Sequence, residues 1–463
     1  MTRLVVVSNR VGPLRDTGKA GGLAVGLVDA LKQRGGLWFG WSGRISEEGT
    51  FGVLHNEGEG SVELATIDLT QQDYDEFYAG YANRALWPAL HYRLDLVENE
   101  RHFEDGYRRV NQRFATRLKA LLRADDILWV HDYHFIPLGG CLRAMGVENP
   151  IGYFLHVPFP GPDVLTALRN ANSLVRELLA YDLVGFQTAG DCGNFRRYVR
   201  EELGGGMREG GLVEGFARKT VARAYPIGID TAGFAEFAGS PIAKRHQQRL
   251  ARAMGGQPLI IGVDRLDYTK GIPQRLNAFA RLLEDYPEHR GHVSFMQIAP
   301  LSRSELDAYA DIRRELTELT GAINARFSDM DWTPVRLMFR SFARMALAGI
   351  YRESRIGLVT PLRDGMNLVA KEFVAAQDPD DPGVLILSRF AGAAEELKEA
   401  LIVNPFAEEE VVEALQRALR MKPDERKQRW KALFGRLATN DANAWSRRFL
   451  ADLAGTTDGQ LVA

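Results

Sequence analysis

The sequence is poor in the residues that build disulfide frameworks and membrane spans. It contains two cysteines, Cys141 and Cys192, which belong to no Cys-x-x-Cys pair. Such sparse cysteine usage excludes a disulfide-stapled scaffold and is typical of reduced, buried thiols in a cytoplasmic protein. No apolar run approaches the roughly 20 residues that span a bilayer, and the run Leu4–Val7 is too short for a secretory signal. We therefore expect a cytoplasmic protein that does not associate with membranes.

The sequence also lacks an excess of either charge and lacks metal-binding spacings. Its 58 basic residues face 60 acidic ones, a balance that argues against non-specific nucleic-acid binding. Any anion site must then be a local cluster of Arg and Lys. No His/Cys/Asp/Glu cluster has metal-ligand spacing, and the Asp-x-Asp pairs that begin at Asp329 and Asp378 indicate turns. We expect no metal and no bound cofactor. A Walker loop and a Gly-x-Ser-x-Gly elbow are absent too.

What the 463-residue chain does have is a series of short, continuous apolar runs, each followed by a turn and a helical pattern. Such runs are typical of strands buried on both faces of a parallel sheet. The alternation of strand and helix predicts an α/β protein with doubly wound parallel sheets. The clearest runs are Leu4–Ser8, Ile127–His131, Ile151–His156, Leu183–Gln187, Leu259–Asp264, Val293–Ala299, Ile356–Thr360, Val384–Ser388 and Leu401–Val403.

Length and the distribution of these runs predict two such domains, because a single core stops growing at roughly 250–300 residues. The Pro/Gly turn Tyr225–Asp230 marks the division. We place an N-terminal domain at residues 1–235 and a C-terminal domain at 236–440. Residues 441–463 form a C-terminal helix that crosses back to the N-terminal domain, followed by a tail.

Ligands of open α/β sheets bind beyond the carboxyl ends of the strands. In the first half, Arg10 follows the first strand, and the pair Gly21-Gly22 enters a helical pattern that suits a phosphate. Asp132 follows Ile127–His131 and can accept hydrogen bonds from sugar hydroxyls, although it could equally cap the next turn. His156 precedes a rigid Pro-containing turn and is either a hydrogen-bond donor, a base or a buried structural residue.

The second half carries the more specific signals. Arg265 and Lys270 lie on one Gly-closed loop after a strand, where two cations can grip a diphosphate. After Ile356–Thr360, the segment Asp364-Gly365-Met366-Asn367-Leu368 opens a helix whose free N–H groups favour an anion. One turn further, the carboxylate of Glu372 can accept both hydroxyls of a ribose.

Together these stretches resemble retaining glycosyltransferases of the GT-B fold, and specifically the trehalose-6-phosphate synthase family over nearly the whole length. The matching segments are Val5–Arg10, Gly21–Gly26, Leu37–Gly43, Leu86–Pro88, His91–Arg93, His131–His134, Phe154–Pro160, Tyr225–Ile229, Arg265–Gly271 and Pro361–Glu372. Two features depart from the pattern: a shorter loop between Arg10 and Gly21, and Gly161 where a Thr is common. The resemblance implies two facing Rossmann-like domains with the active site in the cleft between them.

The resemblance also implies roles for individual residues. Asp132, His156, Arg265 and Lys270 are the expected catalytic residues. The expected donor-binding residues are Gly22, Arg265, Lys270, Arg344, Asp364, Gly365, Met366, Asn367, Leu368 and Glu372. The expected acceptor-binding residues are Arg10, Trp41, Tyr78, Trp87, Asp132, Gln187 and Arg303.

The implied reaction transfers glucose from UDP-glucose, or another nucleotide-glucose, to glucose 6-phosphate with retention of configuration, giving trehalose 6-phosphate. The resemblance also implies a separate phosphatase that releases trehalose, and a homo-oligomer, since relatives are often tetrameric. The alternatives are a glucosylglycerol-phosphate synthase, a pseudo-glycosyltransferase, a GT-B phosphorylase with pyridoxal phosphate on Lys371, and a non-catalytic sugar-phosphate sensor.

Overall fold

The computed structural model describes residues 2–12, 27, 31, 35–47, 54–59, 62–303 and 306–457, and it divides into two compact units. Unit 1 runs from the N-terminal strand to Pro226 and includes the C-terminal segment from Asn443; unit 2 is Ile227–Ala442. The division thus falls within the Tyr225–Asp230 turn. The predicted boundary at residue 235 lies inside helix α9 (Thr231–Gly239).

Unit 1 is built on a sheet whose described part has the order β3-β4-β2-β1-β5-β6-β7-β10-β9-β8. The strands from β4 to β10 in this order pair in parallel, whereas β3, β9 and β8 add antiparallel pairs at the two edges. The strands are β1 (Leu4–Arg10), β2 (Gly36–Ile45), β3 (Leu54–Glu59), β4 (Val62–Leu69), β5 (Ile127–His131), β6 (Ile151–Phe154), β7 (Leu183–Phe186), β8 (Gly206–Met207), β9 (Leu212–Glu214) and β10 (Thr220–Ala224).

The apolar runs in the first half of the sequence form the centre of this sheet. Strands β5, β6 and β7 are almost wholly buried, as the lack of polar alternation predicted. The outer strands β2–β4 and β8–β10 were not predicted. Gly, polar or charged residues interrupt the apolar runs of these strands, although most residues of β2 and β10 are buried.

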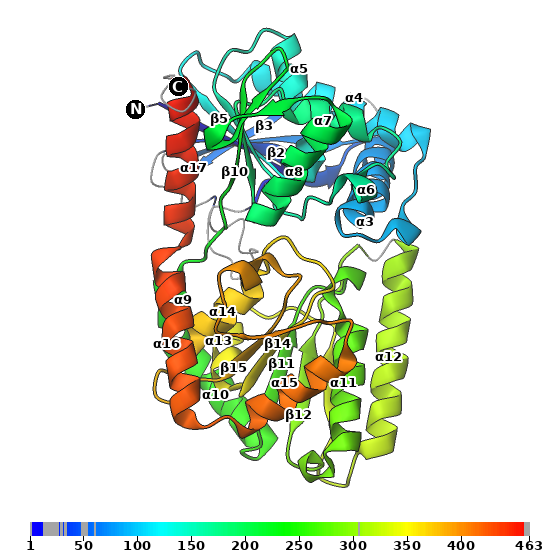
Figure 1. Cartoon of the computed structure of the whole chain (residues 1–463), viewed down its shortest axis with the longest axis vertical. Helices are drawn as coiled ribbons and strands as arrows, with labels where there is room; N and C mark the ends of the chain where they lie inside the picture. The colour runs from blue at the N-terminus through cyan, green and yellow to red at the C-terminus, as the bar shows by residue number, and fades with distance from the viewer. Residues whose placement is uncertain are drawn as a thin grey trace. The chain divides into compact units, whose positions relative to one another are not determined.

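The helices of unit 1 cover its sheet and join its strands (Figure 1). They are α2 (Gln71–Asp73), the π-helix η1 (Tyr74–Leu86), α3 (Trp87–Leu90), η2 (Leu94–Leu96), α4 (Arg101–Lys119), η3 (Tyr133–Phe135), α5 (Leu138–Ala144), α6 (Pro162–Leu165), α7 (Ala171–Leu178), α8 (Ala189–Glu202), η4 (Glu209–Gly211) and α17 (Ala442–Thr457).

Helix α17, the red helix near the C-terminus in Figure 1, packs on the central strands of unit 1. Its Phe449 ring lies 4.9 Å from Trp129 of β5, and Trp445 lies 4.8 Å from the same ring. Gly152 and Gly185 provide the room, because a Cβ at either would come within 2.8 Å of the Phe449 ring. These buried aromatic contacts hold helix α17, which is distant in sequence, against the sheet.

Unit 2 has a six-stranded parallel sheet among its described residues, in the order β13-β12-β11-β14-β15-β16. Numbered from its own first strand, this is the Rossmann order 3-2-1-4-5-6, in which the winding reverses between the first and fourth strands. The strands are β11 (Leu259–Val263), β12 (Ser294–Ile298), β13 (Val335–Met338), β14 (Ile356–Val359), β15 (Val384–Ser388) and β16 (Leu401–Val403).

The helices of unit 2 alternate with these strands, so the predicted α/β architecture is confirmed in both units. They are α9, α10 (Pro241–Met254), η5 (Tyr268–Lys270), α11 (Ile272–Asp285), η6 (Pro287–His289), α12 (Asp307–Phe327), α13 (Arg344–Glu353), α14 (Leu368–Ala376), η7 (Gly392–Glu395), α15 (Glu408–Arg420) and α16 (Pro423–Thr439). None of the described helices is both long and apolar enough to cross a lipid bilayer.

Candidate active site

The winding reversal of unit 2 brings together two loops that are nearly 100 residues apart in sequence. β11 pairs with β14, so the loop after β11 and the loop after β14 leave neighbouring strand ends. Lys270 Nζ of the first loop lies 2.5 Å from Asp364 Oδ2 of the second. The Asn367 side-chain amide donates to the same carboxylate oxygen at 3.0 Å. Three predicted donor-site residues therefore form one cluster at the topological switch point.

The turn that begins helix α14 depends on the backbone of Asn367. Asn367 has φ 75°, a left-handed conformation that few residues other than Gly and Asn adopt readily. Its side-chain oxygen caps the helix by accepting from the Ala370 N–H at 3.2 Å. Gly365 and Met366 are buried in the turn, and Leu368 is the first helical residue. The turn thus presents the positive end of α14 beside Lys270.

Arg265 belongs to a second polar group, which is centred on the buried carboxylate of Asp267. The guanidinium of Arg265 lies 3.8 Å from Asp267 and donates to Ser302 Oγ at 3.0 Å. Arg303 lies 3.7 Å from the same carboxylate and donates to Tyr309 Oη at 2.7 Å. Burial by itself would raise the pKa of Asp267, but Arg265, Arg303 and Lys270 outweigh it and hold that pKa below its usual value.

Glu372, the predicted ribose ligand, lies one turn into α14. Burial raises its pKa to about 7, an effect that Arg344 opposes. Arg344 is itself held over the rings of Phe234 and Phe237, with its guanidinium carbon 5.4 Å and 5.6 Å from their centroids. Gly22, the remaining predicted donor residue, lies outside the described residues.

In unit 1, three of the predicted acceptor residues meet at the end of β1. The Arg10 guanidinium lies 4.9 Å from the Trp41 ring centroid, and it donates to the carbonyl oxygen of Gly43 at 3.2 Å. The Tyr78 ring lies 5.5 Å from that of Trp41 and stacks on His134 at 5.9 Å. A cation held against an aromatic ring, with a second ring packed on the first, suits a phosphate attached to a sugar.

Trp87 is linked to this group through the intervening rings of Tyr133 and His134. Its ring lies 5.7 Å from Tyr133, which lies 4.1 Å from His134, the residue on which Tyr78 stacks. Arg303, which we had grouped with these acceptor residues, belongs to unit 2 and to the Asp267 group.

Asp132 follows β5 in a strained backbone conformation. Its φ of 73° and ψ of 168° fall in a region that is essentially reserved for glycine. Its Oδ1 accepts from the backbone N–H of His156 at 3.2 Å, which links the ends of β5 and β6. Strain held at one polar residue after a buried strand is a feature of functional sites.

His156 lies in a chain of side-chain hydrogen bonds. Its Nε2 lies 3.0 Å from His131 Nδ1, and Gln187 Nε2 lies 3.3 Å from its Nδ1. Burial lowers the pKa of His156 to about 3 and that of His131 well below its usual value, so both rings are neutral near pH 7. A neutral ring whose two nitrogens both contact protein groups is suited to orienting neighbours, and it is a weak base.

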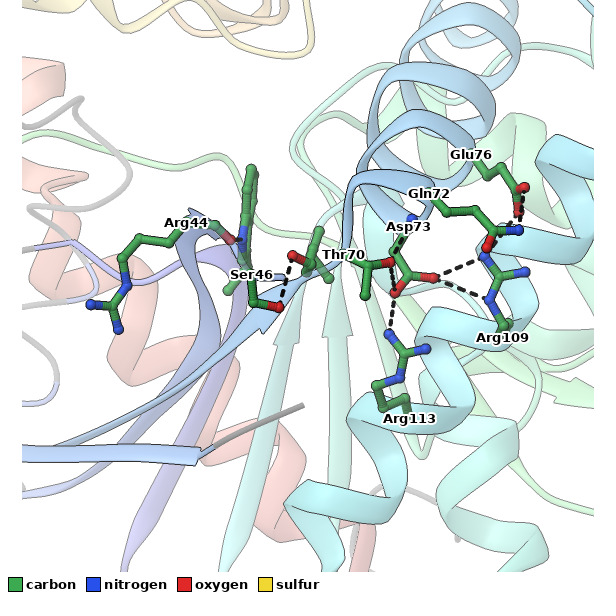
Figure 2. Close-up of polar contacts among 10 residues, drawn as sticks. Arg44, Ser46, Thr70, Gln72, Asp73, Glu76, Arg109 and Arg113 are labelled. Atoms are coloured by element: carbon green, nitrogen blue, oxygen red, sulfur yellow. Dashed lines mark hydrogen bonds and ion pairs between the residues drawn. The ribbon is translucent and has the colours of Figure 1, made fainter. Parts of the chain in front are cut away.

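The residues that position Tyr78 were not predicted from the sequence. Asp73 ends α2 immediately before η1 and is only 1% exposed. Figure 2 shows its carboxylate between Arg113, with which it forms a short ion pair, and Arg109, whose Nη2 lies 2.8 Å away. Burial alone would raise the pKa of Asp73, but these two guanidinium groups lower it. The network fixes the start of a π-helix, an element that frequently accompanies functional sites.

Arg275 is a second functional residue that sequence reasoning missed. It is fully buried in α11 and donates to Asp264 at 2.6 Å, to Thr360 Oγ1 at 2.9 Å and to the carbonyl oxygen of Lys270 at 2.8 Å. It therefore ties the ends of β11 and β14 to the loop that carries Lys270. Its only sequence signal is an arginine on the apolar face of an amphipathic helix.

No group of three or more His, Cys, Asp or Glu side chains that could hold a metal ion occurs in the part of the chain that the structure describes. Among the described residues at the switch point, Lys270 and the N-terminus of α14 are the groups suited to an anion. Two doubly wound units with such a site define a glycosyltransferase of the GT-B fold.

Comparison with known proteins specifies the family. The model of glycosyltransferase family 20 matches residues 9–455. A trehalose-6-phosphate synthase from Sinorhizobium fredii is 48% identical over 462 residues, which cover 99% of each chain. The chain belongs to glycosyltransferase family 20, together with the trehalose-6-phosphate synthases.

Two solved structures support the same assignment. A UDP-forming α,α-trehalose-phosphate synthase from Burkholderia xenovorans in complex with glucose 6-phosphate has a TM-score of 0.95 at 48% identity, covering 98% of this chain and 100% of that one. A structure from E. coli bound with UDP-2-fluoro glucose has a TM-score of 0.94 at 46% identity, covering 98% of this chain and 99% of that one.

Proposed function

We propose that the chain transfers glucose from UDP-glucose to glucose 6-phosphate, forming α,α-trehalose 6-phosphate and UDP. The observation that carries this proposal is the cluster at the β11–β14 switch point, where Lys270 and the N-terminus of α14 meet. A cation beside a helix N-terminus can bind the diphosphate of a nucleotide-sugar. Glu372 lies one turn further, where a ribose would extend. The UDP-forming relatives supply the particular donor.

The acceptor is proposed from the group at the end of β1. Arg10 beside Trp41 offers a cation for the 6-phosphate, and Trp41 with Tyr78 offers aromatic faces for the sugar. The Burkholderia xenovorans relative in complex with glucose 6-phosphate supports this choice over glycerol 3-phosphate or a cyclitol. Asp132, held beside the His156 backbone, is proposed to accept a hydrogen bond from an acceptor hydroxyl.

The proposed chemistry retains the α-configuration of the donor. The anomeric hydroxyl of the acceptor attacks from the face that the diphosphate leaves, and the leaving diphosphate takes the proton of that hydroxyl. No protein nucleophile is needed, so catalysis consists of orientation and of stabilising the departing charge by Arg265 and Lys270. The rival route makes Asp132 a covalent nucleophile; rapid quenching and mass spectrometry would then reveal a glucosyl adduct on it.

The Lys371 environment does not suit the phosphorylase alternative. Its amine is fully buried, forms an ion pair with Glu396 and donates to the carbonyl oxygen of Ile227. A lysine so engaged is not free to form a Schiff base with a cofactor. Location in the cytoplasm, homo-oligomer formation and a separate downstream phosphatase stay predictions.

The test is turnover of the purified chain with UDP-glucose and glucose 6-phosphate, with the product identified by NMR. An α,α-1,1-linked disaccharide phosphate would support donor, acceptor and stereochemistry together. Parallel reactions with ADP-glucose and GDP-glucose test the base, and glycerol 3-phosphate tests the acceptor. Turnover only with one of these substitutes would overturn the substrate assignment and leave the transferase assignment intact.

A further inference from the structure

Lys371 is a buried charge that the proposed reaction does not use. It lies in α14 with 0% of its surface exposed. Its Nζ donates to the carbonyl oxygen of Ile227 at 2.7 Å and forms a short ion pair with the carboxylate of Glu396. Burying an ammonium group is costly unless its partners compensate for lost water. Both partners therefore help to fix where this lysine, and the helix that carries it, can lie.

Ile227 occupies a particular place in the chain, because it is the first residue of unit 2 after Pro226. The chain leaves unit 2 again at Ala442. These two segments lie side by side within unit 2, since the Ala442 N–H donates to the carbonyl oxygen of Ile229 at 3.2 Å. Within the described part of the chain, the segments through which the chain enters and leaves unit 2 therefore lie side by side.

Close packing of the backbone holds the two segments together. A Cβ at Gly228 would lie 2.1 Å from the carbonyl oxygen of Asn440, so only glycine permits this approach. Thr231 Oγ1 donates to the carbonyl oxygen of Leu437 at 3.0 Å, which adds a bond one turn away. We call the paired segments Ile227–Ile229 and Asn440–Ala442 the crossing point.

Helix α14 carries the donor groups at the residues next to Lys371. Glu372 follows it directly, and the N-terminus at Leu368 lies one turn before it. The C-terminal part of the helix is also held in place, because Trp430 Nε1 of α16 donates to the carbonyl oxygen of Val374 at 3.0 Å. A short helix moves as a rigid body, so a shift at Lys371 becomes a shift of both donor groups.

We propose that Lys371 is a positioning residue that ties the donor-binding helix α14 to the crossing point through the carbonyl oxygen of Ile227. The inference rests on the proposed function, because it concerns the residues that would hold the nucleotide. Its consequence is that nucleotide affinity depends on a bond that touches no ligand. The competing role for Lys371 is to neutralise Glu396, and the two roles make different predictions.

The experiment measures the Kd of UDP by calorimetry, together with kcat and both KM values. Four variants are compared: Lys371→Met, Glu396→Gln, the double variant Lys371→Met/Glu396→Gln, and the exposed control Lys398→Met. The double variant removes both charges at once, so it leaves no unpaired carboxylate to unfold the chain. Glu396→Gln keeps an acceptor for Lys371 and leaves the bond to Ile227 in place.

We expect the double variant to retain the melting temperature of the wild type within a few degrees. It should bind UDP about tenfold more weakly, because about that much affinity is lost when one charge-assisted hydrogen bond no longer positions the helix. Its KM for UDP-glucose rises and its KM for glucose 6-phosphate does not. Glu396→Gln and Lys398→Met bind UDP as the wild type does.

Wild-type UDP affinity in the double variant would overturn the inference, as would an equal loss in Glu396→Gln. The failure of the proposed function gives a different result. If the wild type binds UDP but forms no trehalose 6-phosphate, the function is wrong and the UDP measurements still decide the role of Lys371. If the wild type does not bind UDP, both proposals are overturned.

Discussion

Replacing Lys270 by alanine tests the proposed chemistry most directly. Its Nζ lies 2.5 Å from Asp364 Oδ2, and only 11% of its side chain is exposed, so its charge is poorly screened by water. A preorganised donor at a developing negative charge contributes about 2.7–4 kcal/mol to catalysis. Since about 1.36 kcal/mol corresponds to a factor of ten in rate, kcat of Lys270→Ala should fall about 100- to 1,000-fold.

The measurement is the initial rate of UDP release at saturating UDP-glucose and glucose 6-phosphate. Because a leaving-group contact strengthens as charge develops, kcat should fall much more than the KM for UDP-glucose rises. Added propylammonium ion should restore part of the rate to Lys270→Ala by entering the space that the side chain leaves. Lys398→Ala, at an exposed position of unit 2, should retain wild-type kcat.

One side effect needs its own control, because Lys270→Ala also leaves Asp364 without its cation. The Asp364 carboxylate, no longer offset by the charge of Lys270, would repel the diphosphate and lower the rate for a reason unrelated to the leaving group. In the double variant Lys270→Ala/Asp364→Asn this repulsion is gone, and we expect kcat to recover by less than about tenfold. A single variant with kcat within about threefold of wild type, or a double variant that recovers fully, would refute the leaving-group role.

Three further predictions follow from buried or strained groups. Arg113→Ala removes one of the two cations that hold Asp73, so it should lower the free energy of unfolding by about 1–3 kcal/mol and raise the KM for glucose 6-phosphate. Below pH 7 the Glu372 carboxylate, whose pKa is about 7, takes up a proton and loses acceptor capacity, so the affinity for UDP-glucose should fall as pH falls. The free energy of unfolding of Asp132→Gly should exceed that of Asp132→Ala by about 1 kcal/mol. Both variants lose the carboxylate, and only glycine relieves the backbone strain at φ 73°.

Each of these predictions has a matched comparison. Arg117→Ala, at an exposed position of the same helix α4, should change the free energy of unfolding by less than about 0.5 kcal/mol in denaturant titrations. If Arg117→Ala lost as much stability as Arg113→Ala, the ion pair with Asp73 would not explain the effect of Arg113→Ala. Glu372→Gln should make the calorimetric affinity for UDP-glucose independent of pH, and a wild-type profile that is equally flat argues against the raised pKa. An Asp132→Ala variant as stable as Asp132→Gly would show that the backbone there is not strained.

Much of this protein could be read from local sequence. The continuous apolar runs predicted the central strands of both sheets, because a strand covered on both faces has no place for polar alternation. The strands β2–β4 and β8–β10 escaped this reasoning, since Gly, polar or charged residues interrupt their apolar runs. The two predicted donor loops, after β11 and after β14, could be found from sequence because each contains a strand end, a glycine and charged residues. All of these lie within eight or nine consecutive residues.

The sequence by itself determined the α/β class, the two-unit organisation and the family, because these depend on short-range patterns and on many ordered motifs. Only the tertiary structure decided which side chains meet. The ion pair between Lys270 and Asp364, the two arginines on Asp73 and the bond from Lys371 to Ile227 join residues 94, 36 and 40, and 144 positions apart. Such pairings follow from strand order and crossover winding, which bring distant segments to one sheet edge and which no local pattern encodes.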